Sequence, residues 1–257
     1  MLEQFFIEIK AFQLDRLITV YLPKSYHATS KRYPVLYMHD GQNVFHDERA
    51  INGTSLGLEA YLDEHEIDVI VVGIDRNIEE NGRLNEYCPW INGPYSEKIL
   101  GYASDTGGKG KDYIDFIVKE LKPSIDQKYR TDENRTYMAG ISLGALITTY
   151  AVCRYPEIFK KAIALSSAYY RNQEKIEKLI TVSDLSSIEK FYMDSGAREG
   201  AEDDRINSEF LAWNHAVYKL LKEKVTNLRF EIIPGAEHHY IYFKKRMPEA
   251  IDYILKD

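Results

Sequence analysis

The 257-residue sequence has few cysteines and no long apolar stretch, and both features limit what the chain can be. Two cysteines, Cys88 and Cys153, cannot form the disulfide framework on which small secreted domains depend. No apolar run approaches the roughly 20 residues that a membrane-spanning helix needs. The N-terminal residues lack the basic segment and apolar core of a secretion signal. We therefore expect a cytoplasmic protein with no membrane association.

Positively charged residues are fewer than negatively charged ones. Lysine and arginine number 33 against 40 aspartates and glutamates, so the net charge is −7. A surface of this sign repels nucleic acid, and we expect none as a partner. The hydrophobic fraction of 44% and the charged fraction of 28% are typical of a globular protein, expected here as a single domain over residues 1–257. The sequence leaves the oligomeric state open, a homodimer included.

Short apolar runs alternate with helical patterns along most of the chain. Residues 5–9 and 16–22 predict an antiparallel pair of strands, because they alternate in polarity and lie close together. Continuous apolar runs, typical of strands buried on both faces of a parallel sheet, occur at 35–38, 69–74, 137–139, 162–165, 191–193 and 230–233. Helical spacing occurs at 113–121, where Pro123 is expected to bend or end the helix, at 210–221 and at 248–255. The pattern predicts an α/β fold: a mostly parallel sheet, an antiparallel N-terminal start and helices on both faces.

Residues 76–110 interrupt this alternation with glycines, prolines and aromatic residues. A stretch of this length and composition predicts a functional loop at the active site. Its Tyr87 and Trp90 are predicted to bind substrate, because aromatic rings line many ligand pockets. Further candidates for the pocket are Tyr95, Tyr102, Tyr169 and Tyr170, with Arg76, Arg83 and Arg171 for an anionic substrate.

Gly140-Ile141-Ser142-Leu143-Gly144 fits the pattern G-x-S-x-G. The motif follows a predicted strand at 135–139 and precedes a predicted helix at 145–155, as in the nucleophile elbow of the α/β-hydrolase fold. The two glycines leave room for a serine at strained dihedral angles. The helix N-terminus brings free N–H groups beside the hydroxyl. Ser142 is therefore the predicted nucleophile.

A serine hydroxyl needs a base to remove its proton. The α/β-hydrolase order of serine, acid and histidine leaves His215, His238 and His239 as candidates. His215 lies inside the predicted helix 210–221, where a structural role is simpler. His238 and His239 follow a predicted strand and a Pro-Gly pair, at the edge of the sheet where active sites form. Position alone does not decide between these two.

The acid is expected after the predicted strand 190–193. Glu199 is the preferred residue, because it lies in a Gly-rich turn just beyond the strand. Asp194, Asp203 and Asp204 remain alternatives at this point.

Two backbone amides are expected to form an oxyanion hole. One belongs to Leu143, directly after the nucleophile. The other is assigned to Gln42, in the loop after the strand 35–38, where Gly41 allows a tight turn. Asp40 and Gly41 are predicted to contact the substrate from the same loop.

These residues resemble the esterase family that includes enterochelin esterases, feruloyl and acetylxylan esterases, S-formylglutathione hydrolases and mycolyltransferases. The resemblance covers nearly the whole chain, and its most specific segments are residues 33–43, 86–90, 120–123, 140–144 and 235–238. In this family the catalytic histidine often follows a glycine by three positions and precedes an aromatic residue by five, which selects His238 between Gly235 and Phe243. The family's Gly-x-x-Asp or Gly-x-x-Glu pattern supports Glu199. Its Asp-Gly pair before the second oxyanion amide supports Gln42.

The resemblance implies a serine carboxylic-ester hydrolase that acts through an acyl-enzyme on a small, aromatic or carbohydrate-linked ester. The alternatives are a trilactone siderophore esterase and a hydrolase-like binding protein without activity. Transfer of the acyl group to another alcohol instead of water also stays open. No metal or other cofactor is expected, because the histidine–aspartate and histidine–histidine pairs lack ligand spacing on a common helix face.

Overall fold

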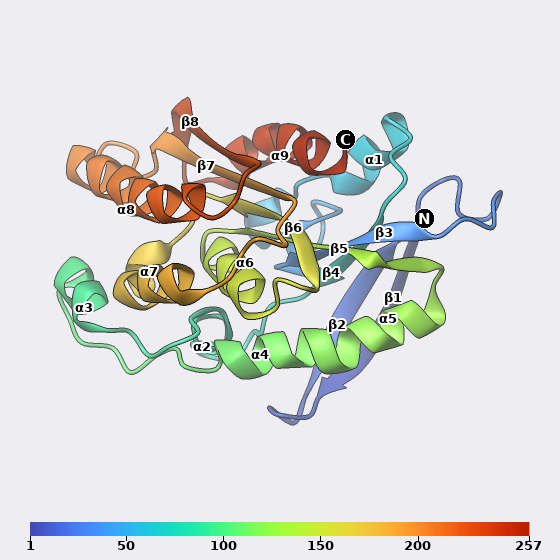
Figure 1. The fold of residues 1–257 in the computed structure, drawn as a ribbon, viewed down its shortest axis with the longest axis horizontal. Helices are drawn as coiled ribbons and strands as arrows, with labels where there is room; N and C mark the ends of the chain where they lie inside the picture. Colours follow the sequence, from blue (N-terminus) through green and yellow to red (C-terminus); the bar gives the residue numbers. More distant parts are fainter. Residues whose placement is uncertain (257) are drawn as a thin grey trace.

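An eight-stranded sheet forms the centre of the computed structural model, which describes residues 1–256 (Figure 1). The strands are β1 (Leu2–Ile9), β2 (Leu14–Tyr21), β3 (Tyr33–His39), β4 (Ile70–Ile74), β5 (Thr131–Ile141), β6 (Phe159–Leu165), β7 (Lys190–Arg198) and β8 (Leu228–Glu237). Their order is β1-β2-β4-β3-β5-β6-β7-β8. β2 pairs antiparallel with β1 and β4, and every other pair is parallel. The predicted mostly parallel sheet with an antiparallel start is confirmed.

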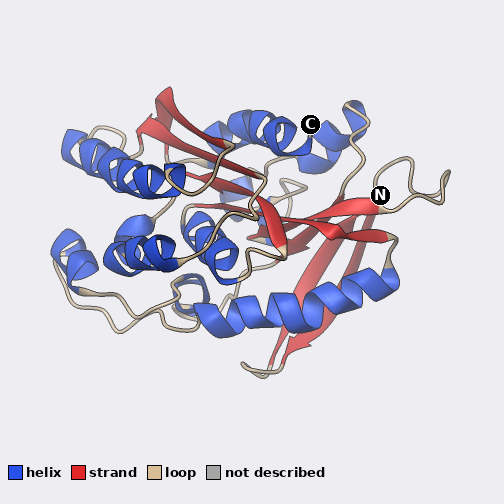
Figure 2. Cartoon of the chain, viewed as in Figure 1, coloured by secondary structure: helices blue, strands red, loops and turns tan. Residues whose placement is uncertain are grey.

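Helices cover both faces of the sheet (Figure 2). They are α1 (Leu58–Glu64), α2 (Gly82–Tyr87), α3 (Pro94–Leu100), α4 (Gly110–Phe116), α5 (Lys122–Lys128), α6 (Leu143–Arg154), α7 (Gln173–Val182), α8 (Asp204–Lys222) and α9 (Tyr240–Leu255). α1 and α9 pack on one face, around Leu62, Met247 and Ile251, and α4 to α8 form the larger core on the other face. Among the described residues, none of these helices combines the length and apolar character that crossing a bilayer requires.

Pro123 does not end its helix, contrary to one of the two expected outcomes. α4 continues through a π-helical turn, Ile117–Leu121, directly into α5, where Pro123 occupies the first turn. A proline removes one backbone donor and crowds the carbonyl of the preceding turn. The wider π turn just before Pro123 relieves the crowding between the proline ring and this carbonyl, so the helix continues past the proline.

The segment 76–110 was predicted to be one continuous loop. The structure corrects this, because the segment contains α2 and α3. A buried ion pair anchors α2: the Nη1 and Nη2 atoms of Arg16 donate to the Glu86 carboxylate, at 2.9 and 2.8 Å. The glycines and prolines of the segment lie mainly at its helix ends and turns. Composition therefore identified an irregular region but not its short helices.

The parallel strands bring distant residues to one edge of the sheet. The carboxyl ends of β3, β5, β6, β7 and β8 all point the same way, since each pair is parallel. The residues that follow these ends are Asp40, Ser142, Ser166, Glu199 and His238. Clefts outside the carboxyl ends of such strands are the usual place for binding sites in α/β sheets.

Candidate active site

Ser142 occupies the sharp turn between β5 and α6. Its dihedral angles, φ 58° and ψ −117°, are ones that side chains rarely adopt. Gly140 permits the turn, because a Cβ atom there would lie 2.1 Å from the carbonyl oxygen of Gly144. The Ser142 N–H donates to the Leu165 carbonyl at 2.9 Å, which ties the turn to β6. The local backbone thus holds the hydroxyl at the edge of the sheet.

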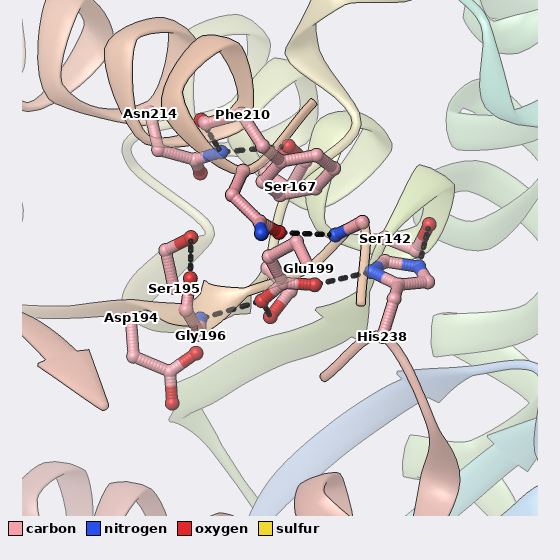
Figure 3. A network of polar contacts seen from close by, with 12 residues as sticks. Ser142, Ser167, Asp194, Ser195, Gly196, Glu199, Phe210, Asn214 and His238 are labelled. Atoms are coloured by element: carbon pink, nitrogen blue, oxygen red, sulfur yellow. Dashed lines mark hydrogen bonds and ion pairs between the residues drawn. The ribbon is translucent and has the colours of Figure 1, made fainter. Parts of the chain in front are cut away.

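His238 connects this hydroxyl to a carboxylate (Figure 3). Its Nε2 lies 2.9 Å from the Ser142 Oγ, and its Nδ1 lies 2.6 Å from a Glu199 oxygen, Oε2. The imidazole follows directly after β8 and packs against two rings, with centroids 5.5 Å from Phe210 and 5.3 Å from Phe243. These contacts orient the ring while about a third of it stays exposed, at 32%. The structure therefore brings together the three residues predicted as nucleophile, base and acid.

Glu199 is held by two further donors on its other oxygen. The Ser166 hydroxyl and the Gly196 N–H both donate to Oε1, each at 2.5 Å. Burial raises the pKa of the carboxyl, but the bond to His238, aided by Ser166 and Gly196, outweighs burial and leaves the pKa lowered. Glu199 is thus an ionised acceptor for the imidazole at neutral pH.

The alternative acids have other contacts. Asp194 lies within β7 and accepts a hydrogen bond from Arg246 at 2.9 Å. Asp203 caps α8, because its carboxylate accepts from the Ile206 N–H at 3.0 Å. Asp204 lies in the first turn of α8, where its negative charge interacts favourably with the helix dipole.

The two alternative histidines make structural contacts away from Ser142. His239 is the N-cap residue of α9, and its Nδ1 accepts from the Ile241 N–H at 3.2 Å. His215 lies in α8 against the rings of Tyr218 and Phe230. Of the three candidates, only His238 lies within hydrogen-bonding distance of Ser142 among the described residues.

The two predicted oxyanion donors lie at the start of α6 and in a 3-10 turn. Leu143 is the first residue of α6, so its N–H has no acceptor within the helix. Gln42 lies in the 3-10 turn Gly41–Asn43, and its side-chain oxygen accepts from the Arg76 N–H at 3.0 Å. Gly41 packs directly on β4, since a Cβ atom there would lie 2.5 Å from the Gly73 carbonyl carbon. The role of the two amides in binding an oxyanion stays a prediction.

Asp40 helps to build the wall of the site. It has a left-handed backbone, φ 55°, and its carboxylate accepts two hydrogen bonds from Arg83, both at 2.7 Å. The Asp40 N–H donates to the Tyr87 hydroxyl at 3.0 Å. Asp40 therefore links the loop after β3 to α2, and it also lines the cavity beside Ser142.

The two aromatic residues predicted to bind substrate lie elsewhere. Tyr87 is fully buried in the larger core, where its hydroxyl supports Asp40 from behind. Trp90 packs edge-on against Tyr150, with ring centroids 5.4 Å apart, and does not line the cavity beside Ser142. Their side chains point into the protein, a direction that the composition of 76–110 does not reveal.

The cavity beside Ser142 is lined by both polar and apolar side chains and has a volume of about 240 Å³. Sequence reasoning missed Asn43, Asn52 and Tyr240, which line it together with Arg76. Asn52 precedes a glycine and adopts a left-handed conformation, φ 64°, so the Asn-Gly pair was a usable turn signal. Nothing in the sequence around Tyr240 indicated its role. Among the described residues, no group of three histidines, cysteines or carboxylates is placed to hold a metal ion.

A parallel sheet of this order, with a strained serine after β5 and a histidine after β8, defines a protein of the α/β-hydrolase fold. The same fold occurs in the IroE-like serine hydrolase from Shewanella oneidensis, with a TM-score of 0.80, 20% identity, and coverage of 100% of this chain and 80% of that one. The chain belongs to the Esterase family: the family model described as "Putative esterase" matches residues 9–254.

Two proteins of Bacillus subtilis (strain 168) are similar in sequence. The uncharacterized protein YbbA is 31% identical over 247 residues, which cover 93% of this chain and 92% of YbbA. The ferri-bacillibactin esterase BesA is 24% identical over 243 residues, which cover 80% of this chain and 81% of BesA. The family match places the chain among the esterases.

Proposed function

We propose that the protein is a serine carboxylic-ester hydrolase that works through an acyl-enzyme. The observation that supports this most is the connected series from Ser142 to His238 to Glu199, at 2.9 and 2.6 Å. A base at hydrogen-bonding distance from a hydroxyl, itself oriented by a third group, is the arrangement that activates a serine.

The proposed reaction has two steps. The Ser142 oxygen attacks the ester carbonyl while His238 Nε2 takes its proton, and the Leu143 and Gln42 amides stabilise the oxyanion. His238 then gives the proton to the leaving alcohol as the carbon–oxygen bond breaks. In the second step His238 takes a proton from water as the water oxygen attacks the acyl-enzyme, and His238 then returns this proton to the Ser142 oxygen as the acid leaves. Glu199 stabilises the imidazolium that forms in each step.

Labelling with a fluorophosphonate probe tests this mechanism directly. The probe is expected to form one covalent adduct at Ser142, because only an activated serine attacks the phosphorus. Peptide mapping by mass spectrometry would locate the adduct. Prior denaturation is the control, since it separates Ser142 from His238 and should abolish labelling. A protein that stays unlabelled when folded would support the non-catalytic alternative.

Arg76 suggests a second feature of the substrate: an anionic group near the ester bond that is cleaved. Arg76 lines the cavity, and within residues 1–256 no carboxylate is paired with it, whereas Arg83 is neutralised by Asp40. An unpaired arginine is well suited to bind a carboxylate or phenolate. The absence of Trp90 and Tyr87 from the cavity gives a purely aromatic or sugar-ring substrate less support.

Replacing Arg76 with glutamine is therefore expected to discriminate between esters. KM for an ester with a free carboxylate should rise about tenfold, the effect of losing one charge-assisted hydrogen bond at a partly exposed site. KM for a neutral p-nitrophenyl ester should not change. Steady-state kinetics on both esters would measure the difference, with Arg49→Gln as a matched variant, because Arg49 pairs with Asp75 and does not line this cavity. Equal effects on the two esters would contradict the assignment.

A trilactone siderophore is the second candidate substrate. The similarity to BesA favours it, and so does a neighbouring cavity of about 240 Å³ that shares Arg76 and Arg83 and reaches Leu143. Together the two cavities flank the nucleophile and offer more room than a small ester needs. Comparing kcat/KM for an iron-free catecholate trilactone, its iron complex and p-nitrophenyl acetate would separate the two candidates.

A further inference from the structure

Behind the carboxylate of Glu199 lies a buried arginine from α9. Arg246 is 5% exposed, and it donates through Nη2 to the Ser166 hydroxyl at 3.0 Å and through Nη1 to Asp194 at 2.9 Å. Ser166 in turn bonds to Glu199 Oε1 at 2.5 Å. The contacts therefore run without a break from Arg246 through Ser166 and Glu199 to His238.

The direction of these hydrogen bonds follows from the chemistry of the groups. A guanidinium can only donate, so the Ser166 oxygen accepts from Arg246 and its single proton is directed at Glu199. An ionised Glu199 can only accept, so His238 must carry its proton on Nδ1. His238 Nε2 is then left as the acceptor that faces the Ser142 hydroxyl. The ionised Glu199, which Ser166 and Arg246 support from behind, thus determines the tautomer of the base.

The charges in this region also depend on Arg246. The side chains of Asp194 and Glu199 have no exposed surface, and both lie near the same guanidinium, at 2.9 and 4.0 Å. Burial raises the pKa of Asp194 to about 7, although Arg246 opposes the shift. Without the arginine, two buried carboxylates would face each other with no buried cation, and at least one would take up a proton. A protonated Glu199 would be a poor acceptor for His238.

We propose that Arg246 and Ser166 are positioning residues of the active site: Arg246 orients the Ser166 hydroxyl, and together they keep Glu199 ionised with Oε2 directed at His238. This inference rests on the proposed function for its effect on catalysis. Neither residue is placed to touch the substrate, and both act through Glu199. The Arg246 guanidinium carbon also lies 4.9 Å from the centroid of the Phe243 ring, which packs against His238. α9 therefore supports the imidazole both through Glu199 and through Phe243.

Ser166→Ala is the central test, because it removes one hydroxyl and leaves the rest of the side chain in place. Turnover of p-nitrophenyl acetate should fall by about 10- to 100-fold in kcat with KM unchanged, as expected for a lost hydrogen bond to a charged group. Arg246→Met should lower kcat further, and Arg246→Lys should recover much of the loss, because an ammonium group also only donates. Ser195→Ala is the matched control: Ser195 is equally buried, but its hydroxyl bonds to the Gly196 carbonyl. Its kcat should equal that of the wild type.

A spectroscopic measurement separates this inference from the proposed function. The proton shared by His238 Nδ1 and Glu199 should give a downfield resonance in the proton NMR spectrum, and it should persist in the inactive Ser142→Ala protein. Adding Ser166→Ala or Arg246→Met in that background should shift it upfield or remove it. An unchanged resonance and an unchanged kcat in folded Ser166→Ala, checked by circular dichroism, would overturn the inference. Failure of fluorophosphonate labelling with these NMR shifts intact would instead overturn the proposed function.

Discussion

Replacement of Ser142 by alanine is expected to lower kcat for p-nitrophenyl acetate by about 10,000-fold or more, the usual effect of removing a serine nucleophile. The hydroxyl is the group that His238 Nε2 faces at 2.9 Å, and α6 points its N-terminus at the same place. Without that oxygen no acyl-enzyme can form. KM should change little, since alanine leaves the cavity walls in place. Stopped assays at high enzyme concentration would measure the residual rate.

The fold should tolerate this change. Alanine and serine meet nearly the same strain at φ 58°, so the melting temperature of the variant should stay close to that of the wild type. A mock purification from host cells without the expression plasmid would show the background from contaminating esterases. Turnover above that background in a correctly folded Ser142→Ala protein would rule out Ser142 as the nucleophile.

Glu199→Gln should be nearly as damaging, with kcat lowered by about 10,000-fold, as in other triads whose acid is changed to an amide. The reason lies in the two donors on Oε1. Ser166 and Gly196 both require an acceptor there, so the glutamine must place its oxygen on that side and its NH₂ toward His238. The imidazole would then accept at Nδ1 and carry its proton on Nε2, facing Ser142 with a donor. The base would be present in the wrong tautomer.

Two controls refine this expectation. Glu199→Asp retains an acceptor and should lose much less activity than Glu199→Gln. Asp203→Asn changes an alternative acid, but asparagine can cap α8 in the same way, so both activity and stability should be retained. If Asp203→Asn were the more damaging change, the acid would have to be reassigned. Measurement of kcat at several pH values would show whether the loss in Glu199→Gln is independent of pH, as a wrong tautomer requires.

Much of the fold and the centre of the site could be predicted because the signals are local. The apolar runs of the inner parallel strands are set by burial on both faces. The elbow needs its glycines within five residues of sequence. Once the strand order is known, Ser142 and His238 must lie at the same edge of the sheet. These features depend on short-range patterns that a sequence displays directly.

The choice between His238 and His239 could not be made from position, because both follow the same strand. The structure separates them by direction: His238 faces Ser142, and His239 turns back to cap α9. Tyr87 and Trp90 were misplaced for a related reason. An aromatic residue near a site can face the ligand or the core, and composition does not distinguish these. The buried contact between Arg246 and Ser166 joins residues 80 positions apart, so no local pattern could have indicated it.

The order in which the site is completed has a consequence for synthesis. Ser142 and His238 lie 96 residues apart, so a ribosome extends the chain far past the elbow before it makes the imidazole. A nascent chain can therefore form most of the sheet and still have an inert hydroxyl. Arg246 emerges later again, on the last helix. Under the proposed mechanism, ester cleavage can begin only after β8 and α9 have joined the rest of the protein, so the onset of catalysis would mark the end of folding.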